Sequence, residues 1–512
     1  MNQIPRRKFV KSVGSLAALT STSCFAPSSS LASAVTDSDL PFLSLVETAE
    51  MIRRRLISST ELTIMMLKRI DAIDDTWKAY ATVMGESALQ EARTADEEIE
   101  RGNYKGRLHG IPIAVKDLCF TKGVRTMGGC AVRKEFVPAY DATVITRYKE
   151  AGAVMLGKLN LTEGAMAGYN RELEVPANPW NPQAWPGCSS SGSGVAAAAG
   201  LAYGTLGSDT GGSIRFPAAA CGIVGLKPTW GRVSRYGVLA LADSLDTVGP
   251  MTRSVADAAI MLQAIAGYDS KDPTTLSDDV PKYLPRFKRL SGIRIGLDEN
   301  YISEDVDPEV AEGVLRAVGV LEKLGATIVK VRVPDLSEHV NQWTTLCRVE
   351  ASIAHREYYP KRREEYGIWY QNFLDKGTTV GAEAQTAVTA EQYAKALNHR
   401  NICNGKFSRV FQDIDMLACP SSPALPHHVT PEIQYGLDSA AGLGGNWGKF
   451  TNPSNYNGAP TLSVPCGFSQ TGLPLSLQLV GKHLQEALLC QVGHRYEQAT
   501  PWHKKRPPMK SA

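Results

Sequence analysis

The chain has 512 residues, of which 43% are hydrophobic and 21% are charged, which is enough for a large buried core. Its 55 basic side chains nearly balance 52 acidic ones, and a net charge of +3 gives no electrostatic basis for binding nucleic acid. The sequence contains no run of 18 apolar residues, so no membrane span is expected.

The N-terminus has the features of an export signal. The basic run Pro5-Arg6-Arg7-Lys8-Phe9-Val10-Lys11 precedes a weakly apolar stretch over residues 13–26, and Ala32-Ser33-Ala34 offers a small-residue cleavage site. This order is typical of a twin-arginine signal and predicts export of residues 35–512 to the periplasm or beyond. Residues 1–34 hold four basic and no acidic residues, so the mature chain would carry a net charge of −1. A basic tail with no targeting role is the alternative.

Hydrophobic periodicity after residue 44 predicts an α/β chain with a mixed central sheet covered by helices on both faces. We expect a loop that enters a buried, alanine-rich helix across 187–200 and a surface connection at 268–290. The expected helices are 45–72, 86–101 and 307–325, and the expected strands are 111–115, 153–156, 201–206 and 293–297.

Lys116 ends the apolar run 111–115 and precedes Asp117. A lysine at a strand end is ordinarily solvated. If Lys116 is instead buried beside hydroxyl groups, desolvation lowers its pKa and lets it act as a base. That interpretation requires Asp117 to point to the opposite face of the strand, as the twofold alternation of side chains allows.

Two glycine- and serine-rich turns carry the candidate nucleophiles. Ser213 follows Gly211-Gly212, and the backbone amides of Thr210, Gly211, Gly212 and Ser213 are predicted to form an oxyanion hole. Ser189 lies in the run 187–194, ahead of the alanine-rich segment. The alternatives are a serine that caps a helix and a flexible linker.

Taken together, these motifs resemble the amidase signature family in order and spacing. The resemblance covers about residues 45–500, with a signature core at about 105–260. It rests on the following blocks: Gly110-Ile-Pro-Ile-Ala-Val-Lys-Asp117, 157–168, 187–194, Gly207-Ser-Asp-Thr-Gly-Gly-Ser-Ile-Arg-Phe-Pro-Ala218, 222–228, Asn452-Pro-Ser-Asn-Tyr-Asn-Gly-Ala-Pro460 and 472–481.

The resemblance implies one large domain of amidase signature fold with a Ser-cisSer-Lys triad. Ser213 would attack an amide carbonyl and form an acyl-enzyme. Ser189, reached through a cis peptide bond on one of its two sides, would relay the proton. Lys116 would be the general base and return the proton to the leaving amine.

No cofactor or metal is predicted. The sequence has no phosphate-binding loop, no dinucleotide fingerprint and no clustered Cys/His ligand set, and most cysteines are expected to be buried free thiols. The resemblance implies a small-molecule amide as the partner, and the sequence does not indicate an oligomeric state.

The substrate range is expected to depend on positions near Ser189 and on the variable segment 335–450. The family commonly has glycine where this chain has Cys188 and Ser191, and we count both with Met127 as predicted substrate contacts. Aromatic residues in the segment favour apolar or aryl amides, unless they only pack a lid: Trp343, Tyr358, Tyr359, Tyr366, Trp369, Tyr370, Phe373 and Trp447.

Two other functions are compatible with the same motifs. The first is the glutamine-hydrolysing subunit of a tRNA-dependent amidotransferase, which the export signal opposes because that assembly is cytoplasmic. The second is a catalytically silent binding protein on the same fold, which the presence of Lys116, Ser189 and Ser213 disfavours.

Overall fold

The computed structural model describes residues 36, 38–284, 289–377, 387–435 and 446–508. The chain divides into two compact units, Met1–Leu43 and Ser44–Ala512. The described part of the first unit contains the short 3-10 helix η1, Leu40–Phe42. The predicted export signal, residues 1–34, lies outside the described residues, and the account below concerns the second unit.

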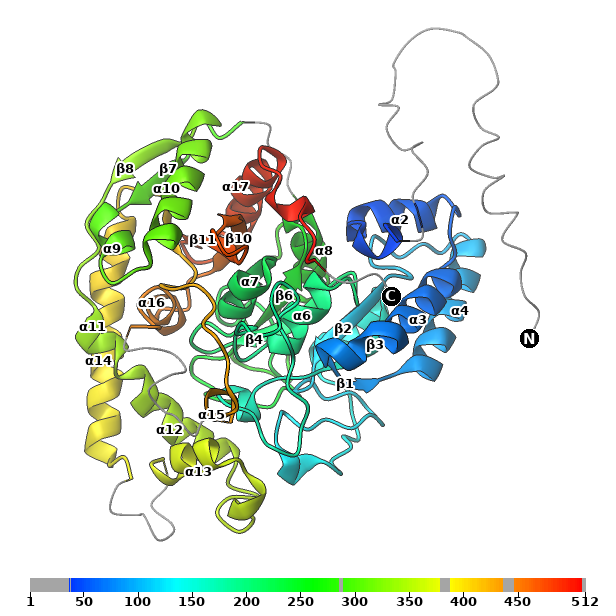
Figure 1. The fold of residues 1–512 in the computed structure, drawn as a ribbon, viewed down its shortest axis with the longest axis horizontal. Helices are drawn as coiled ribbons and strands as arrows, with labels where there is room; N and C mark the ends of the chain where they lie inside the picture. Colours follow the sequence, from blue (N-terminus) through cyan, green and yellow to red (C-terminus); the bar gives the residue numbers. More distant parts are fainter. Residues whose placement is uncertain (1–35, 37, 285–288, 378–386, 436–445, 509–512) are drawn as a thin grey trace, which may run out of the picture. The chain divides into compact units, whose positions relative to one another are not determined.

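The second unit is built on one mixed sheet of eleven strands, which confirms the predicted α/β fold (Figure 1). The strand order is β1-β3-β2-β4-β6-β5-β10-β11-β9-β7-β8. The strands are β1 (Tyr80–Val83), β2 (Pro112–Lys116), β3 (Val154–Leu159), β4 (Thr205–Asp209), β5 (Val224–Lys227), β6 (Thr247–Thr252), β7 (Arg294–Leu297), β8 (Thr327–Lys330), β9 (Met416–Pro420), β10 (Thr461–Phe468) and β11 (Pro474–Gly481).

The pairing changes direction along the sheet. Strand β2 pairs in parallel with both β3 and β4, and β7 pairs in parallel with β8 and β9. The strands between these two groups pair antiparallel. Because β2, β3 and β4 are parallel neighbours, their carboxyl ends meet at one edge of the sheet.

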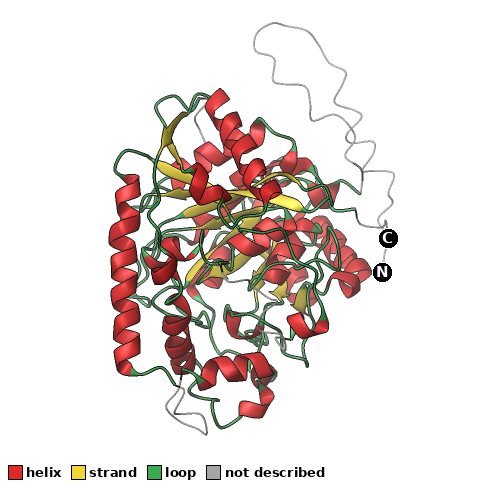
Figure 2. Cartoon of the chain, turned by 60° about the vertical axis from the view of Figure 1, so that its left-hand side comes forward, coloured by secondary structure: helices red, strands yellow, loops and turns green. Residues whose placement is uncertain are grey.

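Helices flank the sheet on both faces (Figure 2). Helices α6 and α7 contact each other and strands β4, β5 and β10, and helices α8 and α17 contact each other and strands β6 and β10. The helices are α2 (Leu45–Arg53), α3 (Ser59–Trp77), α4 (Gly85–Glu100), α5 (Thr143–Glu150), α6 (Ser191–Ala198), α7 (Arg215–Cys221), α8 (Val255–Ile265), α9 (Glu299–Ser303), α10 (Pro308–Lys323), α11 (Ser337–Val340), α12 (Trp343–Ala354), α13 (Ile368–Asp375), α14 (Ala390–Ser408), α15 (Pro431–Gln434), α16 (Asn452–Tyr456) and α17 (Glu486–Gln498).

Two predicted elements need correction. The helix expected at 45–72 is two helices, α2 and α3, because Arg55 takes a left-handed conformation (φ 58°) and Ser58 begins a new helix in a capping box with Glu61. The strand expected at 201–206 begins only at Thr205 and continues to Asp209. Residues 201–204 instead connect α6 to β4, since Gly200 ends the preceding segment with φ +66°.

The other predicted helices and strands are confirmed to within three residues at each end. The pattern at 86–101 is α4, 111–115 is β2, 153–156 begins β3, 293–297 is β7 and 307–325 is α10. Strands β2 and β4 are buried at every residue, as expected for parallel strands with both faces covered.

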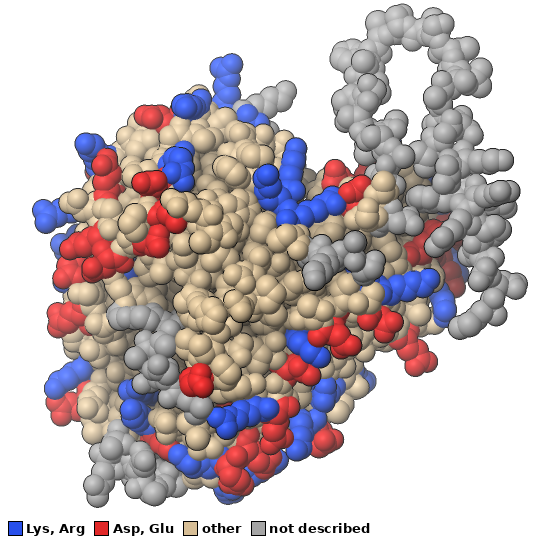
Figure 3. Space-filling view, in the orientation of Figure 1, with Lys and Arg blue, Asp and Glu red and all other residues tan. Residues whose placement is uncertain are grey.

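One face of the molecule shows charges of both signs. On the face shown in Figure 3, basic and acidic side chains are interspersed around the rim, and the centre carries few charges. In the described part of the chain, no helix combines the length and the hydropathy that crossing a membrane requires.

Candidate active site

Lys116 is the last residue of β2 and is completely buried. Its Nζ lies 2.7 Å from Ser189 Oγ, 2.9 Å from Ser190 Oγ and 3.0 Å from Ser208 Oγ. Ser208 belongs to β4, the parallel neighbour of β2, and the other two serines come from the loop before α6. The ends of β2 and β4 and the loop before α6 therefore surround the Lys116 amine with three hydroxyl groups.

Burial lowers the pKa of Lys116 to about 7, although the negative charges of Asp246 and, more weakly, Asp209 act in the opposite direction. The amine thus exchanges its proton near neutral pH, where an exposed lysine stays charged. A lone pair on Nζ can then accept a proton from the Ser189 hydroxyl at hydrogen-bond distance.

Asp117 points away from Lys116, as the interpretation of Lys116 as a base requires. Its Oδ1 lies 3.1 Å from Lys158 Nζ, and its Oδ2 accepts a hydrogen bond of 2.9 Å from the Met127 amide. The pleat of β2 explains this, because consecutive side chains leave opposite faces of the strand. Asp117 is therefore paired with a different cation, and Lys116 keeps its hydroxyl environment.

Ser189 is preceded by a cis peptide bond, Cys188–Ser189, so the cis bond lies on the amino side of this serine. The loop enters α6 in close contact with two other chain segments. A Cβ on Gly192 would come within 2.5 Å of the Asn160 carbonyl and 2.6 Å of the Ala79 carbonyl, so only glycine fits there.

Ser190 joins the two serine turns. Its amide donates to the Ser213 carbonyl at 3.3 Å, its hydroxyl donates to the Ser208 carbonyl at 3.1 Å, and its Oγ accepts from the Ser208 amide at 3.2 Å. These bonds tie the backbone of Ser213, which is 8% exposed, to Ser190, the neighbour of Ser189. The structure therefore joins Lys116 to Ser189 directly and links the Ser213 turn to them through Ser190.

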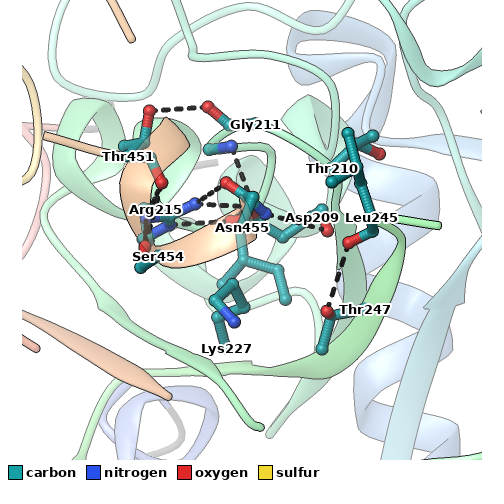
Figure 4. A network of polar contacts seen from close by, with 12 residues as sticks. Asp209, Thr210, Gly211, Arg215, Lys227, Leu245, Thr247, Thr451, Ser454 and Asn455 are labelled. Atoms are coloured by element: carbon teal, nitrogen blue, oxygen red, sulfur yellow. Dashed lines mark hydrogen bonds and ion pairs between the residues drawn. The ribbon is translucent and has the colours of Figure 1, made fainter. Parts of the chain in front are cut away.

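A buried ion pair holds the turn that carries Ser213. Asp209, the last residue of β4, accepts hydrogen bonds from the amides of Gly212 (2.8 Å) and Ile214 (3.1 Å) and forms a bidentate pair with Arg215 (Figure 4). Arg215 also donates to the Thr451 carbonyl, Ser454 Oγ, Gln478 Oε1 and Asn455 Oδ1. Burial alone would raise the pKa of Asp209, but Arg215 holds it well below its usual range.

The predicted oxyanion donors are only partly supported. The Gly212 amide donates to Asp209, so it is already engaged and leaves the predicted set. Trp343 Nε1 donates to the Thr210 carbonyl at 2.9 Å. In a trans peptide the N–H points opposite to the carbonyl, so the Gly211 amide points away from Trp343. Gly211, with Thr210 and Ser213, remains a candidate donor.

The three predicted substrate contacts have different surroundings. Ser191 starts α6, and its Oγ accepts a 2.8 Å hydrogen bond from the Tyr169 hydroxyl. Cys188 is buried, and burial raises the pKa of its thiol to about 12, which keeps it protonated. Met127 lines a small cavity beside the end of β2. Only Met127 is shown to border an open space.

Six of the eight aromatic residues of the variable segment fall into two groups. The rings of Trp343 and Trp447 meet edge to face with their centroids 5.0 Å apart. The ring centroids of Trp447 and Phe216 are 5.9 Å apart. A Cβ on Gly211 would meet the Trp343 ring and one on Gly212 would meet the Phe216 ring, so these rings press on the nucleophile turn. The second group is buried and packs the segment that follows α12 against α13, as the lid alternative expects: Tyr359, Tyr366, Tyr370 and Phe373.

Sequence reasoning missed several residues of the site. Ser190 and Ser208 lie inside the two serine runs that drew attention, but which hydroxyl faces Lys116 depends on strand register. Asp246 accepts a hydrogen bond from the Thr210 hydroxyl and influences Lys116, yet it sits in no motif. Phe216 lies in α7, and its contact with Trp447 could not be predicted because the two residues are far apart in the sequence.

One His/Glu cluster was also not predicted. Among the described residues, ligand atoms of Glu338, His339 and His399 lie within 4.8 Å of one another. The Nδ1 atoms of the two histidines are 2.9 Å apart, and Lys406 Nζ lies 3.0 Å from His339 Nε2. These contacts use both nitrogens of His339 within a hydrogen-bonded chain. The nine described cysteines are free and buried, as expected.

Comparison with known proteins identifies the class. The Amidase family model matches residues 61–490, and the chain belongs to that family. A Mycobacterium tuberculosis protein named "Putative amidase AmiD" is 42% identical over 468 residues, covering 91% of this chain and 96% of the relative. A glutamyl-tRNA(Gln) amidotransferase subunit from Moorella thermoacetica is 41% identical over 494 residues, covering 92% of this chain and 99% of the relative.

A solved structure agrees. The native peptide amidase from Stenotrophomonas maltophilia superposes with a TM-score of 0.77 at 30% identity, over 92% of this chain and 99% of that one. The chain is thus an amidase, an enzyme that hydrolyses amides, and it has the amidase signature fold.

Proposed function

We propose that this amidase works through a triad of Ser213, Ser189 and Lys116 and an acyl-enzyme on Ser213. The observation that carries the proposal is the environment of Lys116, a buried amine with three hydroxyls at 2.7–3.0 Å. Of the acidic residues near it, Asp117 pairs with Lys158, Asp209 pairs with Arg215, and Asp246 accepts hydrogen bonds from the Thr210 hydroxyl and backbone amides. A buried amine of this kind is a base at neutral pH.

The contacts of Lys116 support the following sequence of proton movements. Neutral Lys116 takes the proton of Ser189, whose oxygen takes that of Ser213 as Ser213 Oγ attacks the amide carbonyl. The carbonyl oxygen becomes negative beside the nucleophile turn, where free backbone amides stabilise it. The proton returns from Lys116 through Ser189 to the leaving nitrogen when the C–N bond breaks, and water then releases the carboxylate.

For the substrate, the rings beside the nucleophile turn support apolar or aryl amides. Trp343 and Phe216 are both buried, and Trp447 contacts each of them. Trp447, the half-buried ring of the three, offers a flat apolar surface beside the nucleophile turn.

The N-terminal sequence supports a proposal on localisation. We propose that residues 1–34 direct export by the twin-arginine route, which N-terminal sequencing of the secreted protein tests.

The second candidate function, the glutaminase subunit of a tRNA-dependent amidotransferase, is favoured by the similarity to the Moorella protein. That function requires a partner for full activity.

A substrate panel on the purified mature chain tests the proposed function. We expect anilides and long-chain amides to be hydrolysed without a partner, with kcat/KM at least about tenfold above acetamide because burial of each apolar group adds binding free energy. Ser213→Ala serves as the control and should be inactive on every compound. If glutamine is the one compound of the panel that is hydrolysed, or if activity appears only with added partner subunits, the amidotransferase function is favoured. Turnover of acetamide equal to that of the anilides would refute the aryl preference.

The pKa of Lys116 predicts the pH profile. Below about pH 7 the ammonium form cannot accept a proton, so kcat/KM should fall about tenfold per pH unit there and level off above pH 7. Burial also raises the pKa of Glu163 to about 7, so this residue needs a control. We expect Glu163→Gln to keep the midpoint of the profile. A flat profile from pH 5 to 9 with chemistry rate-limiting would contradict the role of Lys116.

A further inference from the structure

Arg133 is a buried arginine that the proposed mechanism does not use. It ends the 3-10 helix η2 (Ala131–Arg133) and is only 7% exposed. Its guanidinium lies over the Tyr358 ring at 4.8 Å and the Phe136 ring at 5.7 Å. Within the described chain its side chain has no hydrogen-bond or ion-pair partner, and the Nε atom is fully enclosed.

This arrangement leaves N–H donors of Arg133 without an acceptor, and a bound anion would provide one. The two rings contact the faces of the guanidinium and leave its N–H edge free. A buried charge with unsatisfied donors is costly, and a carboxylate is the group that matches the arginine fork. None of the described residues supplies that carboxylate.

Arg133 lines a cavity that also contains Met127, Gly128, Gly164 and His355. The centre of a water molecule can occupy about 20 Å³ of it, so the cavity has room for one small polar group. The remaining wall is mostly apolar: Leu118, Cys130, Leu161, Ala165, Leu239, Ala240 and Ala354.

The cavity adjoins the proposed catalytic residues. Leu118 lies two residues after Lys116 in the chain. The next residue after Leu161, Thr162, donates its amide to the Ser189 carbonyl at 3.3 Å. A group bound in the cavity therefore lies against the loop that carries Ser189.

The neighbouring titratable groups do not neutralise Arg133. Burial, and then the charge of Arg133 itself, lower the pKa of His355 to about 3, so this ring is neutral. Glu163, the residue before Gly164 of the cavity wall, accepts hydrogen bonds from Asn170 (2.8 Å) and the Gly367 amide (2.8 Å) instead. Arg133 is thus the charged side chain among the residues that line the cavity.

We propose that Arg133 binds a carboxylate of the substrate, so that the preferred substrates are amides that carry an anionic group within reach of the cleaved bond. The inference rests on the proposed hydrolytic function and adds a specificity determinant to it. The aromatic surface by Trp343 and the charged cavity by Met127 would then receive the two sides of one molecule.

Matched amide pairs test the proposal on both sides of the bond. For the acyl side the pair is N-succinyl anilide and its neutral isostere, 4-methylpentanoyl anilide. For the amine side the pair is N-benzoyl-β-alanine and N-benzoyl-3-methylbutylamine. We expect the wild type to favour the carboxylate member of at least one pair by about tenfold to a hundredfold in kcat/KM, the usual worth of a charged hydrogen bond.

Variants assign that preference to Arg133. In Arg133→Met the ratio within the pair should fall to about one, and Arg133→Lys should give an intermediate ratio because lysine lacks the planar fork. Arg362→Met is the matched control: Arg362 also lies over the Tyr358 ring, but it pairs with Glu365 and does not line the cavity. This control should keep the wild-type ratio.

The outcomes separate the two claims. If the wild type cleaves the neutral amides but shows no preference in either pair, the role of Arg133 is wrong and the proposed function stands. If it cleaves no member of either pair and none of the wider panel, the proposed function itself fails. A preference that survives in Arg133→Met with native circular dichroism would also overturn the inference. Should that variant not fold, the wild-type ratios and Arg133→Lys still decide.

Discussion

Lys116→Met is expected to lower kcat/KM for an anilide by about 10²- to 10⁴-fold, the contribution of a general acid–base group. Methionine keeps the volume and the burial of the lysine chain but has no lone pair to take the proton of Ser189. Hydrolysis of an ester with a good leaving group should fall less, since that reaction needs less proton delivery. The measurement is kcat/KM for a matched anilide and phenyl ester at pH 8.

The chain offers a matched control for this substitution. Lys227 is a second fully buried lysine at a strand end, and burial lowers its pKa to about 7 as well. Its Nζ donates to the Pro228 carbonyl at 3.0 Å, away from the three serines. Lys227→Met should therefore keep most of the amide turnover. An equal loss in both variants would mean that burial of a lysine, and not its contact with Ser189, explains the effect.

Arg215→Met is expected to destabilise the protein by about 3–5 kcal/mol, because it leaves Asp209 charged and unpaired in the interior. Asp209 has a lowered pKa, so the pair contributes stability above the unfolded pKa of an aspartate and loses it only as the pH falls through the lower folded value. The full effect is thus present at pH 7. Thermal and urea unfolding of the two proteins measure it.

The same variant should also reduce activity. Asp209 fixes the Gly212 and Ile214 amides on either side of Ser213, so a displaced Asp209 moves the nucleophile turn. Arg316→Met is the control, because Arg316 forms an exposed pair with Glu312 and its loss should cost at most about 0.5 kcal/mol. If Arg215→Met is no less stable than this control, the ion pair does not hold the turn.

Much of the fold could be predicted because the strands around the site are short apolar runs bounded by glycine turns. The runs that became β2, β3 and β7 were recognised from local pattern alone. The break between α2 and α3 was not, because it depends on a left-handed residue, Arg55, inside a periodic stretch. The late start of β4 was missed for a similar reason, since the apolar residues before it belong to a buried loop.

The site shows the same division. Lys116 and the two serine turns carry motifs, so their meeting could be expected. The third hydroxyl on Lys116 could not, because Ser208 faces it only in the register that β2 and β4 adopt. Arg133 lay outside every motif, and its burial depends on Tyr358 in a distant part of the chain. Contacts of this kind come from tertiary packing and leave no local pattern.

The most direct test of the account is to find the residue that becomes acylated. Intact-mass and peptide analysis after treatment with a fluorophosphonate probe should give one label per chain, on Ser213, at a rate that rises through pH 7. Ser213→Ala should take up no label, and Lys116→Met should label slowly at the same residue. A label on another residue, or labelling of Ser213→Ala at the wild-type rate, would contradict the assignment of Ser213 as the nucleophile.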